Sequence, residues 1–363
     1  MAAPTNSGVR RFAAATLQNF GQSLLMASGL AEDRARDVAT VLLEADLLGH
    51  TTHGFAMLPA YLKALKEQTM ETTGEPVVIA DHGSAASWDG RYLPGPWLVR
   101  RAIADARARL SNHPVVTISI RRSHHIACLQ AYLQPVTEAG LVILLTCSDP
   151  ASRTVTPHGG VAPRLSPNPL AAGIPTAGEP ILIDISTSST SNGLCNRLAT
   201  DGERLPGLWL IDRKGQATDD PRVLAGDDGG AILPLGGLDL GYKGFALALL
   251  VETLTNALSG HGRANGESHW GASVFLQILD PERFGGRETF LRETSFLAQS
   301  CQDTPVPPGK PPVRLPGQAA LLRRKEQLEN GVTLHPTIWP ALVPWSTTLG
   351  IPLPPSLGTT ATA

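Results

Sequence analysis

The arrangement of helical and strand patterns along the chain is the feature that most restricts its fold. Apolar residues recur with a helical period near both ends, over residues 10–27, 31–48 and 318–331, and a further helix is expected from about Pro59. Short β-branched runs bounded by Gly or Pro lie in the middle, at 114–122, 140–148, 180–186 and 273–281. The sequence therefore predicts an α+β or mixed α/β fold with a central mixed sheet and a helical domain formed by both chain ends.

The remaining segments complete this prediction. Residues 125–140 and 287–300 have helical patterns, and the apolar stretch 240–260 is expected to form a buried helix. The Pro-rich connector 304–317 is expected to be extended, and the Pro-rich tail to lie over the surface. We therefore assign residues 1–75 and 300–363 to the helical domain. Residues 76–299 are assigned to a central cofactor- and substrate-binding region of one or two subdomains.

Composition and charge exclude several classes of partner. The 363 residues carry a net charge of -2 and have no block of basic residues, so neither nucleic acid nor an anionic membrane is an expected partner. The most apolar stretch, residues 244–258, is shorter than a membrane span and is interrupted by Glu252 and Asn256. Residues 1–12 have no apolar run of the signal-peptide type. These features predict a cytoplasmic protein.

The cysteines give no sign of a metal site. Cys128, Cys147, Cys195 and Cys301 form no C-x-x-C pair, and none has histidines at zinc-finger spacing. We therefore expect four reduced, buried thiols and no bound metal.

Three common nucleotide and hydrolase motifs are also missing. No G-x-G-x-x-G follows a predicted strand, and neither G-x-x-x-x-G-K-[ST] nor G-x-S-x-G occurs. An ordinary Rossmann domain, a P-loop and an α/β-hydrolase are therefore not expected.

Polar residues instead collect where predicted strands end or helices begin. His53 and His125 lie at such positions, as do the runs "TCSDP" (146–150), "SPNP" (166–169), "IDISTS" (183–188) and "GYKG" (241–244). Each has an ordinary structural interpretation on its own: a hydrogen-bonding histidine, a turn, a cap at Asp184 or a solvated charge at Lys243. Their common placement predicts that they face one cleft.

The order of these segments carries a family resemblance. The runs "ADLLGHTTHG", "SHHIA", "SDP…PHGG", "NPLAAGIP", "IDISTS", "GYKGFALALLVE" and "LPGQ" resemble the type-2 malate/L-lactate dehydrogenase family over about residues 10–350. That family includes ureidoglycolate dehydrogenases, diketogulonate reductases and cyclic-imine carboxylate reductases. The resemblance implies an NAD(P)H-dependent oxidoreductase with a non-Rossmann cofactor fold. It also implies a homodimer with the active site in a cleft between domains.

The resemblance also implies roles for particular residues. His125 matches the proton donor/acceptor, Asp149 an acidic residue near it, and His53 a histidine beside the nicotinamide. The other positions that match cofactor contacts are Ser148, Asn168, Asp184, Ile185, Ser186, Lys243, Gly317 and Gln318. These residue types suit the chemistry, because hydride transfer to a carbonyl or imine leaves a group that needs a proton. A histidine can supply or remove that proton near neutral pH, and a nearby carboxylate would orient its ring.

The chain departs from the family pattern on the substrate side. Members read S-H-G-x-x-R-L-P-x-Y, where the arginine binds the substrate carboxylate, but this chain has Met57 at the arginine position and keeps Tyr61. A second family arginine falls near Trp270, and Leu48 and Ala127 replace a family arginine and glycine. Thr52, Met57, Tyr61 and Trp270 are the expected substrate-lining residues.

These departures suggest an altered substrate. An apolar methionine cannot replace a bidentate arginine–carboxylate contact, so we expect a ketone or cyclic imine without a carboxylate at the usual position, of a kind common in secondary metabolism. Alternatively, another arginine supplies the charge; the candidates are Arg121, Arg122, Arg153 and, in the loop before Trp270, Arg263.

Two other functional classes remain open at this point. One is a non-redox descendant of the family, such as a cyclase, isomerase or dehydratase, and the other is a binding or scaffold protein. Retention of His125, Asp184 and Lys243 favours the oxidoreductase. The choice between NAD and NADP stays open, with Arg197 and Arg164 as candidates for contact with a 2′-phosphate.

Overall fold

A seven-stranded sheet runs through the middle of the molecule in the computed structural model, which describes residues 9–226 and 229–360. Within these residues every pair of neighbouring strands is antiparallel except β3–β4, which is parallel. In spatial order the strands are β2 (Val77–Asp81), β3 (Ala85–Asp89), β4 (Val115–Ser123), β11 (Ala272–Leu279), β5 (Val142–Ser148), β6 (Leu170–Ile174) and β7 (Ile181–Ile185). The predicted mixed sheet is thus confirmed, and it is not the parallel sheet of a Rossmann domain.

The middle of the sheet is apolar on both faces. β11 lies between β4 and β5, and nearly all of its side chains are buried. α4 (Gly95–Arg109) packs against β4 and β11. A strand covered on both faces is expected to be largely apolar, and "ASVFLQIL" is apolar except for Ser273 and Gln277.

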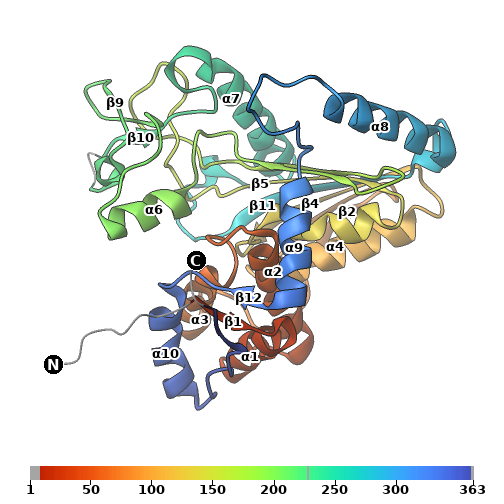
Figure 1. The fold of residues 1–363 in the computed structure, drawn as a ribbon. Coiled ribbons are helices and arrows are strands. Elements are labelled where there is room, and N and C mark those ends of the chain that lie inside the picture. Colours follow the sequence, from red (N-terminus) through yellow and green to blue (C-terminus); the bar gives the residue numbers. More distant parts are fainter. Residues whose placement is uncertain (1–8, 227–228, 361–363) are drawn as a thin grey trace.

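Helices from both ends of the chain lie together on one side of the sheet (Figure 1). They are α1 (Ala14–Ala27), α2 (Glu32–Leu48), α3 (Leu58–Lys66), α9 (Gln318–Asn330) and α10 (Ile338–Leu349). A small sheet of β12 (Val332–Thr333), β1 (Val9–Phe12) and β13 (Gly358–Thr360) joins the two ends. One continuous core runs from Phe12 in this region to Ile278 in the main sheet. The predicted domain boundaries stay a prediction.

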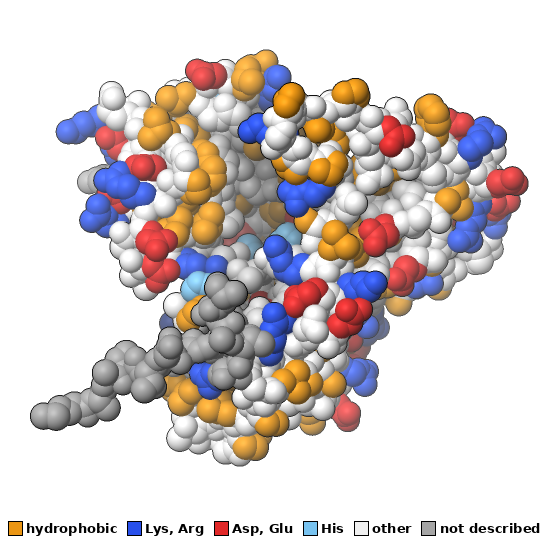
Figure 2. Space-filling model, viewed as in Figure 1, with side chains coloured by type: hydrophobic (Ala, Val, Ile, Leu, Met, Phe, Trp, Pro, Cys, Tyr) orange, Lys and Arg blue, Asp and Glu red, His pale blue; other side chains and the backbone are white. Residues whose placement is uncertain are grey.

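A second, smaller core lies beside the main sheet. It contains Val155, Leu165, Cys195, Leu210 and Ala248. The elements around it are α6 (Asn192–Asp201), β8 (Leu210–Ile211), β9 (Ala217–Thr218), η3 (Pro221–Leu224), β10 (Ala231–Ile232) and α7 (Gly237–Glu252). Figure 2 shows a hollow on the face viewed, with histidine side chains inside it. This region forms one side of the hollow, and the helices from the two chain ends lie on the other side.

The prediction of a buried helix over residues 240–260 is wrong about its burial. α7 and the π-helical turn that follows it (η4, Thr253–Ala257) cover the expected range, but only Gly241, Gly244, Ala248 and Val251 of α7 are buried. Leu238, Leu240, Tyr242, Leu249 and Leu250 are each 47–51% exposed. An apolar sequence predicts that a helix is covered, but it does not say whether the same chain covers it.

Two other segments differ from expectation. Residues 125–140 form η2 (Leu129–Tyr132) and a single turn, α5 (Gln134–Thr137), because Ala127 has a φ of 59° and Pro135 limits the helix. The tail contains α10 despite Pro344 within it, because Trp339 and Leu342 are buried against the core. The other described helices are η1 (Phe55–Met57), η5 (Arg263–Asn265), η6 (Pro281–Arg283) and α8 (Arg287–Gln302).

The cysteines are free thiols, as expected, but they are not all buried. Cys128 and Cys195 are buried, Cys147 is half-buried and Cys301 is exposed. Within residues 9–226 and 229–360, no helix is long and apolar enough to cross a lipid bilayer.

Candidate active site

His125 lies in an irregular segment directly after β4. The backbone of this segment is tightly packed, since a side chain on Gly95, at the start of α4, would come within 2.3 Å of the His125 carbonyl oxygen. Arg122 and Ala127, on either side, have φ values of 49° and 59°. Non-glycine residues in this region of φ carry backbone strain, which often collects at functional sites.

One nitrogen of His125 is held by the protein. The Tyr61 hydroxyl lies 2.9 Å from Nδ1 of His125 and 2.9 Å from its carbonyl oxygen, and the Ala127 nitrogen lies 3.3 Å from Nδ1. The Trp270 ring stacks beside the imidazole at a centroid distance of 5.2 Å, and the His53 ring lies 6.2 Å away. Nε2 is therefore the nitrogen of His125 that is left to face a substrate.

Burial determines the protonation state of these histidines. Loss of hydration lowers the pKa of His125 well below its usual value, and the neighbouring His53 and His124 lower it further. Burial, together with His50 and Arg197, lowers the pKa of His53 to about 4. Both rings are therefore neutral at neutral pH, so His125 is ready to accept a proton.

This lowered pKa predicts different pH profiles for the two reaction directions. With neutral His125 as the expected base for oxidation, kcat/KM for oxidation should be flat from about pH 6 to about pH 8. Reduction needs the protonated ring, so its kcat/KM should fall about tenfold per pH unit over the same range. Steady-state rates across this range test the prediction, and a break near pH 6.5 in either direction would contradict it.

The His53 loop is built around a buried carboxylate. Asp46 of α2 accepts a hydrogen bond from the Phe55 N–H at 2.7 Å, and its carboxyl group occupies the space where a Cβ on Gly54 would lie, at 2.3 Å. The glycine after His53 is therefore required by packing. The Thr52 hydroxyl lies 2.9 Å from Nδ1 of His53, which orients that ring.

Met57 lies at the end of η1 and caps α3. Met57 and Trp270 are both half-buried and packed against the main core. The Trp270 ring contacts Tyr61 at a centroid distance of 5.9 Å and His124 at 4.7 Å. The expected substrate-lining residues Tyr61 and Trp270 thus lie beside His125 and form an aromatic wall.

Three of the four arginines proposed as replacements for the missing anchor have other partners. Arg121 and Arg122 both bind the carboxylate of Asp89, at 3.1 Å and 2.5 Å. Arg263 binds Glu252 at 2.7 Å and also donates to the carbonyls of Asp149 and Ser152. The fourth candidate, Arg153, is exposed and lines a separate small pocket.

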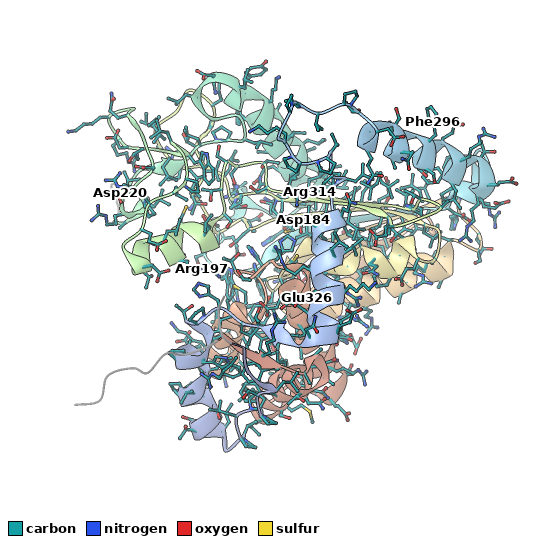
Figure 3. All side chains as sticks on the ribbon, in the orientation of Figure 1. Asp184, Arg197, Asp220, Phe296, Arg314 and Glu326 are labelled. Carbon is teal, nitrogen blue, oxygen red and sulfur yellow. The ribbon has the colours of Figure 1, made fainter. Side chains whose placement is uncertain are left out.

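Arg197 is a cation that does approach His53. Its guanidinium, on α6, donates to the Thr51 hydroxyl at 3.0 Å and to the Thr51 carbonyl at 2.8 Å. This contact links α6 to the His53 loop, and Figure 3 shows Arg197 between the two parts of the molecule. The other candidate for a 2′-phosphate contact, Arg164, donates to the neighbouring Pro163 carbonyl on the surface.

Ser148 and Asn168 belong to a buried polar network around Glu252. The Ser148 hydroxyl and the Asn168 amide donate to Oε1 of Glu252 at 2.8 Å and 2.9 Å, and Arg263 binds the same oxygen. Hydrogen bonds and the charge of Arg263 outweigh burial, so the pKa of Glu252 is lowered. The cofactor roles expected of Ser148 and Asn168 stay predictions.

Asp149 is not the group that orients His125 in this structure. Its carboxylate accepts a hydrogen bond from the Ala151 N–H at 2.9 Å, and burial raises its pKa to about 6. Tyr61 occupies Nδ1 of His125 instead. The predicted catalytic role of Asp149 therefore stays a prediction. The contact that orients the His125 ring comes from Tyr61, which the sequence indicated only as substrate-lining.

Asp184, Ile185 and Gly317 line a cavity of about 680 Å³. The Asp184 carboxylate accepts a hydrogen bond from the Gln130 N–H at 2.8 Å, and Ile185 is 42% exposed. Arg314 and Arg323 also line the cavity, and Figure 3 shows Asp184 and Arg314 near one end of α9. A carboxylate for ribose hydroxyls, an exposed apolar side chain and two cations for phosphates are groups that suit a dinucleotide.

The other expected cofactor residues lie elsewhere. Ser186 bonds to Ser188, and Lys243 is exposed in the second turn of α7, with its amine 5.9 Å from the Tyr242 ring. Gln318 lines a different pocket and accepts a hydrogen bond from the Leu315 N–H. Their roles stay predictions.

The orienting contact of Tyr61 can be tested directly. Tyr61→Phe should lower kcat about fivefold, because one hydrogen bond to the His125 ring is worth about 1 kcal/mol. The affinity for NADH or NADPH should not change, because Tyr61 is not among the residues that line the Asp184 cavity. An unchanged kcat with an unchanged pH profile would show that Tyr61 does not position the ring.

Comparison with known proteins identifies relatives over most of the chain. The profile of the malate/L-lactate dehydrogenase family matches residues 12–343. An L-lactate dehydrogenase of Cupriavidus necator is 30% identical over 345 residues, which cover 93% of this chain and 97% of that protein. A Delta(1)-pyrroline-2-carboxylate/Delta(1)-piperideine-2-carboxylate reductase of Pseudomonas syringae pv. tomato is 33% identical over 82% of this chain and 86% of that protein.

Solved structures show the same architecture. The malate dehydrogenase of Entamoeba histolytica superposes with a TM-score of 0.89 at 22% identity, over 95% of this chain and 99% of that one. The delta1-piperideine-2-carboxylate reductase of Pseudomonas syringae superposes with a TM-score of 0.80 at 27% identity, over 93% and 99%. The chain therefore belongs to the malate/L-lactate dehydrogenase family and is an NAD(P)-dependent oxidoreductase acting on CH–OH or CH–NH groups.

Proposed function

We propose that this protein reduces a ketone or cyclic imine, or carries out the reverse oxidation, on a substrate that lacks a carboxylate at the position facing Met57. The observation that supports this proposal is the wall beside His125, where Trp270 and Tyr61 pack around the imidazole and Met57 joins the same core. Moving a carboxylate from water to such a surface without a partner costs several kcal/mol. A neutral or distally charged substrate avoids that cost.

His125 is the proton donor and acceptor in this proposal. Bound NAD(P)H supplies the hydride, and the protein supplies the proton and the orientation. In the oxidation direction Nε2 of neutral His125 would accept the hydroxyl or amine proton in the tautomer that carries its hydrogen on Nδ1. In that tautomer Nδ1–H donates to the Tyr61 oxygen and the Tyr61 hydroxyl donates to the His125 carbonyl, which keeps the ring in place. Trp270 and Tyr61 limit access of water to the reacting carbon.

The cavity at Asp184 is the proposed dinucleotide site. Asp184 would accept hydrogen bonds from ribose hydroxyls, Ile185 would contact the adenine, and Gly317 would allow close approach at the start of α9. Arg314 and Arg323 would balance the phosphate charge. Titration of the purified protein with NADH and with NADPH, followed by thermal midpoint, identifies the preferred cofactor. No response to either would favour the non-redox alternative, such as a cyclase or dehydratase.

A substrate panel tests the specificity. The panel pairs 2-oxo acids and cyclic-imine carboxylates with neutral ketones and imines of the same size. We expect higher kcat/KM for the neutral member of each pair. Fast reduction of pyruvate, oxaloacetate or a cyclic-imine carboxylate would contradict the proposal.

The exposed face of α7 supports a homodimer. Leu238, Tyr242 and Leu249 are exposed and share one side of the helix, and Phe296 and Leu297 on α8 are 71% and 60% exposed. Figure 3 shows Phe296 pointing outward from α8. Apolar surface of this kind usually marks an interface. Light scattering should give twice the 38.3 kDa chain mass, and a monomer at micromolar concentration would contradict this part of the proposal.

A further inference from the structure

Three side chains with metal-binding atoms meet in the described part of the chain although they lie far apart in sequence. His50 directly follows the C-cap of α2, Cys128 precedes η2, and Asp184 is on β7. One ligand atom from each lies within 4.8 Å of the others. The spacing of the cysteines and histidines in sequence gave no indication of this cluster, because the fold alone brings its members together.

Hydrogen bonds already hold the three groups in place. The Cys128 thiol donates to Oδ2 of Asp184 at 3.5 Å, and the Gln130 N–H donates to the same oxygen at 2.8 Å. Nε2 of His50 lies 2.6 Å from Oε1 of Gln130. Gln130 thus links the imidazole and the carboxylate through its side chain and backbone, which orients the ligands as outer partners do in known metal sites.

The cluster can be reached from solvent. His50 and Asp184 line the cavity of about 680 Å³, whereas Cys128 lies behind them at 3% exposure. An ion entering the cavity would meet the imidazole and carboxylate first. His50 is half-buried, and a shift of its ring by roughly 1 Å would bring all three donors to metal-bonding distances of about 2.0–2.3 Å.

The set of donors favours a particular kind of cation. Sulfur, imidazole nitrogen and carboxylate oxygen together are typical ligands of Zn²⁺, and three protein ligands with a fourth position open to solvent form a common zinc geometry. On binding, the Cys128 thiol loses its proton to solvent, and the thiolate and the carboxylate balance the two charges of the ion. An O-only cation such as Mg²⁺ gains nothing from the sulfur.

We propose that His50, Cys128 and Asp184 form a Zn²⁺ site in the wall of the cavity, and that a bound ion withdraws the Asp184 carboxylate from the cofactor. The site itself stands on the geometry of the three ligands. The second part, competition between metal and cofactor, rests on the proposed dinucleotide site. The protein would therefore be inhibited by Zn²⁺ bound in the Asp184 cavity, which His125 does not line, although Cys128 lies only three residues after His125 in the sequence.

Cobalt(II) titration of the full chain under oxygen-free conditions tests the site without any assay of activity. A thiolate ligand should give a charge-transfer band in the near ultraviolet, and four-coordinate cobalt should give intense visible bands. Zn²⁺ should then displace the cobalt and abolish both signals. Absence of the charge-transfer band would overturn the proposal.

Variants identify the ligands. Cys128→Ala should abolish the charge-transfer band, and Cys301→Ala, which removes the exposed thiol on α8, should leave it unchanged. His50→Ala tests the same site at a half-exposed position that should not disturb folding, and it should weaken Zn²⁺ at least about 100-fold. A band that survives in Cys128→Ala, or unchanged Zn²⁺ affinity in His50→Ala, would exclude this site.

The competition is measured separately. Adding NADH or NADPH should raise the apparent Kd for Zn²⁺ in proportion to cofactor concentration. If cobalt binds as predicted but neither dinucleotide binds, the metal site stands and the proposed function fails. If a dinucleotide binds and cobalt shows no thiolate band, the metal site fails and the proposed function stands. Simultaneous binding of both without mutual effect would overturn the competition alone.

Discussion

His125→Asn is expected to lower kcat by about 10²- to 10⁴-fold, the usual contribution of a positioned general acid or base. Asparagine cannot take up the proton that leaves the substrate in oxidation, nor deliver one in reduction. It is smaller than histidine and polar, so the segment between Arg122 and Ala127 should keep its backbone. The loss should therefore appear in kcat for both directions.

The measurement separates loss of chemistry from loss of structure. The thermal shift caused by NADH or NADPH should be the same in His125→Asn as in the unmodified protein, since His125 does not line the Asp184 cavity. His82→Asn, at an exposed position before β3, is the matched control and should leave kcat unchanged. Turnover of His125→Asn within a fewfold of normal would remove His125 from the proton-transfer role.

His53→Asn offers a useful contrast. His53 lies 6.2 Å from His125 and helps to keep its pKa low, but its own Nδ1 is engaged by Thr52. Its replacement should lower kcat less than that of His125. This ranking follows from the roles that the family resemblance implies for the two histidines, since a side-chain hydroxyl engages Nδ1 of both rings in the structure.

The fold was predictable for segments whose own residue pattern shows which face is buried. The patterns around α1, α2, α9, β4, β5, β7 and β11 were sufficient, because a long amphipathic period or a β-branched run states which face is buried. The burial of α7 was not predictable, since its leucines are exposed in the single chain. The helix α10 was missed because its prolines suggested an irregular tail, whereas burial of Trp339 outweighs the lost hydrogen bond at Pro344.

The candidate site was predictable as a set of residues but not as a set of contacts. Motif order indicated His53, His125, Tyr61 and Asp184, and the structure places the first three together and the fourth in a separate cavity. Asp46 and Arg197 were missed as partners of the His53 loop. The requirement for Gly54 was one available signal for a close neighbour, but nothing in the sequence identifies Asp46 as that neighbour. The contacts that hold Arg263 beside Glu252 were not predictable either. They include hydrogen bonds from Arg263 to residues 97–115 positions away in the sequence, which no local pattern indicates.

Met57→Arg is expected to raise kcat/KM for 2-oxo acids by about 10- to 100-fold relative to neutral ketones of the same size. A guanidinium at this position can form a bidentate, charge-assisted contact with a substrate carboxylate, worth about 1.5–3 kcal/mol. Met57 is half-buried at the N-cap of α3 and stands where the family pattern has its arginine, so we expect an arginine introduced here to reach the substrate. Paired steady-state assays on each oxo acid and its neutral analogue measure the change.

Two variants at the same position separate charge from geometry. Met57→Leu keeps an apolar surface and should leave the ratio between the paired substrates unchanged. Met57→Lys supplies a point charge without the planar fork of arginine, so it should raise the ratio less than Met57→Arg. An equal rise for lysine and arginine would mean that long-range charge, and not a bidentate contact, controls the selectivity.

The result also decides between the two explanations for the missing arginine. If another cation already binds the carboxylate, the unmodified protein should reduce 2-oxo acids well, and a second charge at position 57 should add little. Arg121, Arg122 and Arg263 are each bound to a carboxylate of the protein, so using one of them would require breaking an existing ion pair. If none of these arginines leaves its ion pair, the site beside Trp270 is neutral. The single arginine of Met57→Arg should then be enough to restore preference for an anionic substrate. A gain in Met57→Arg combined with poor oxo-acid turnover in the unmodified protein is therefore the outcome that the structure favours.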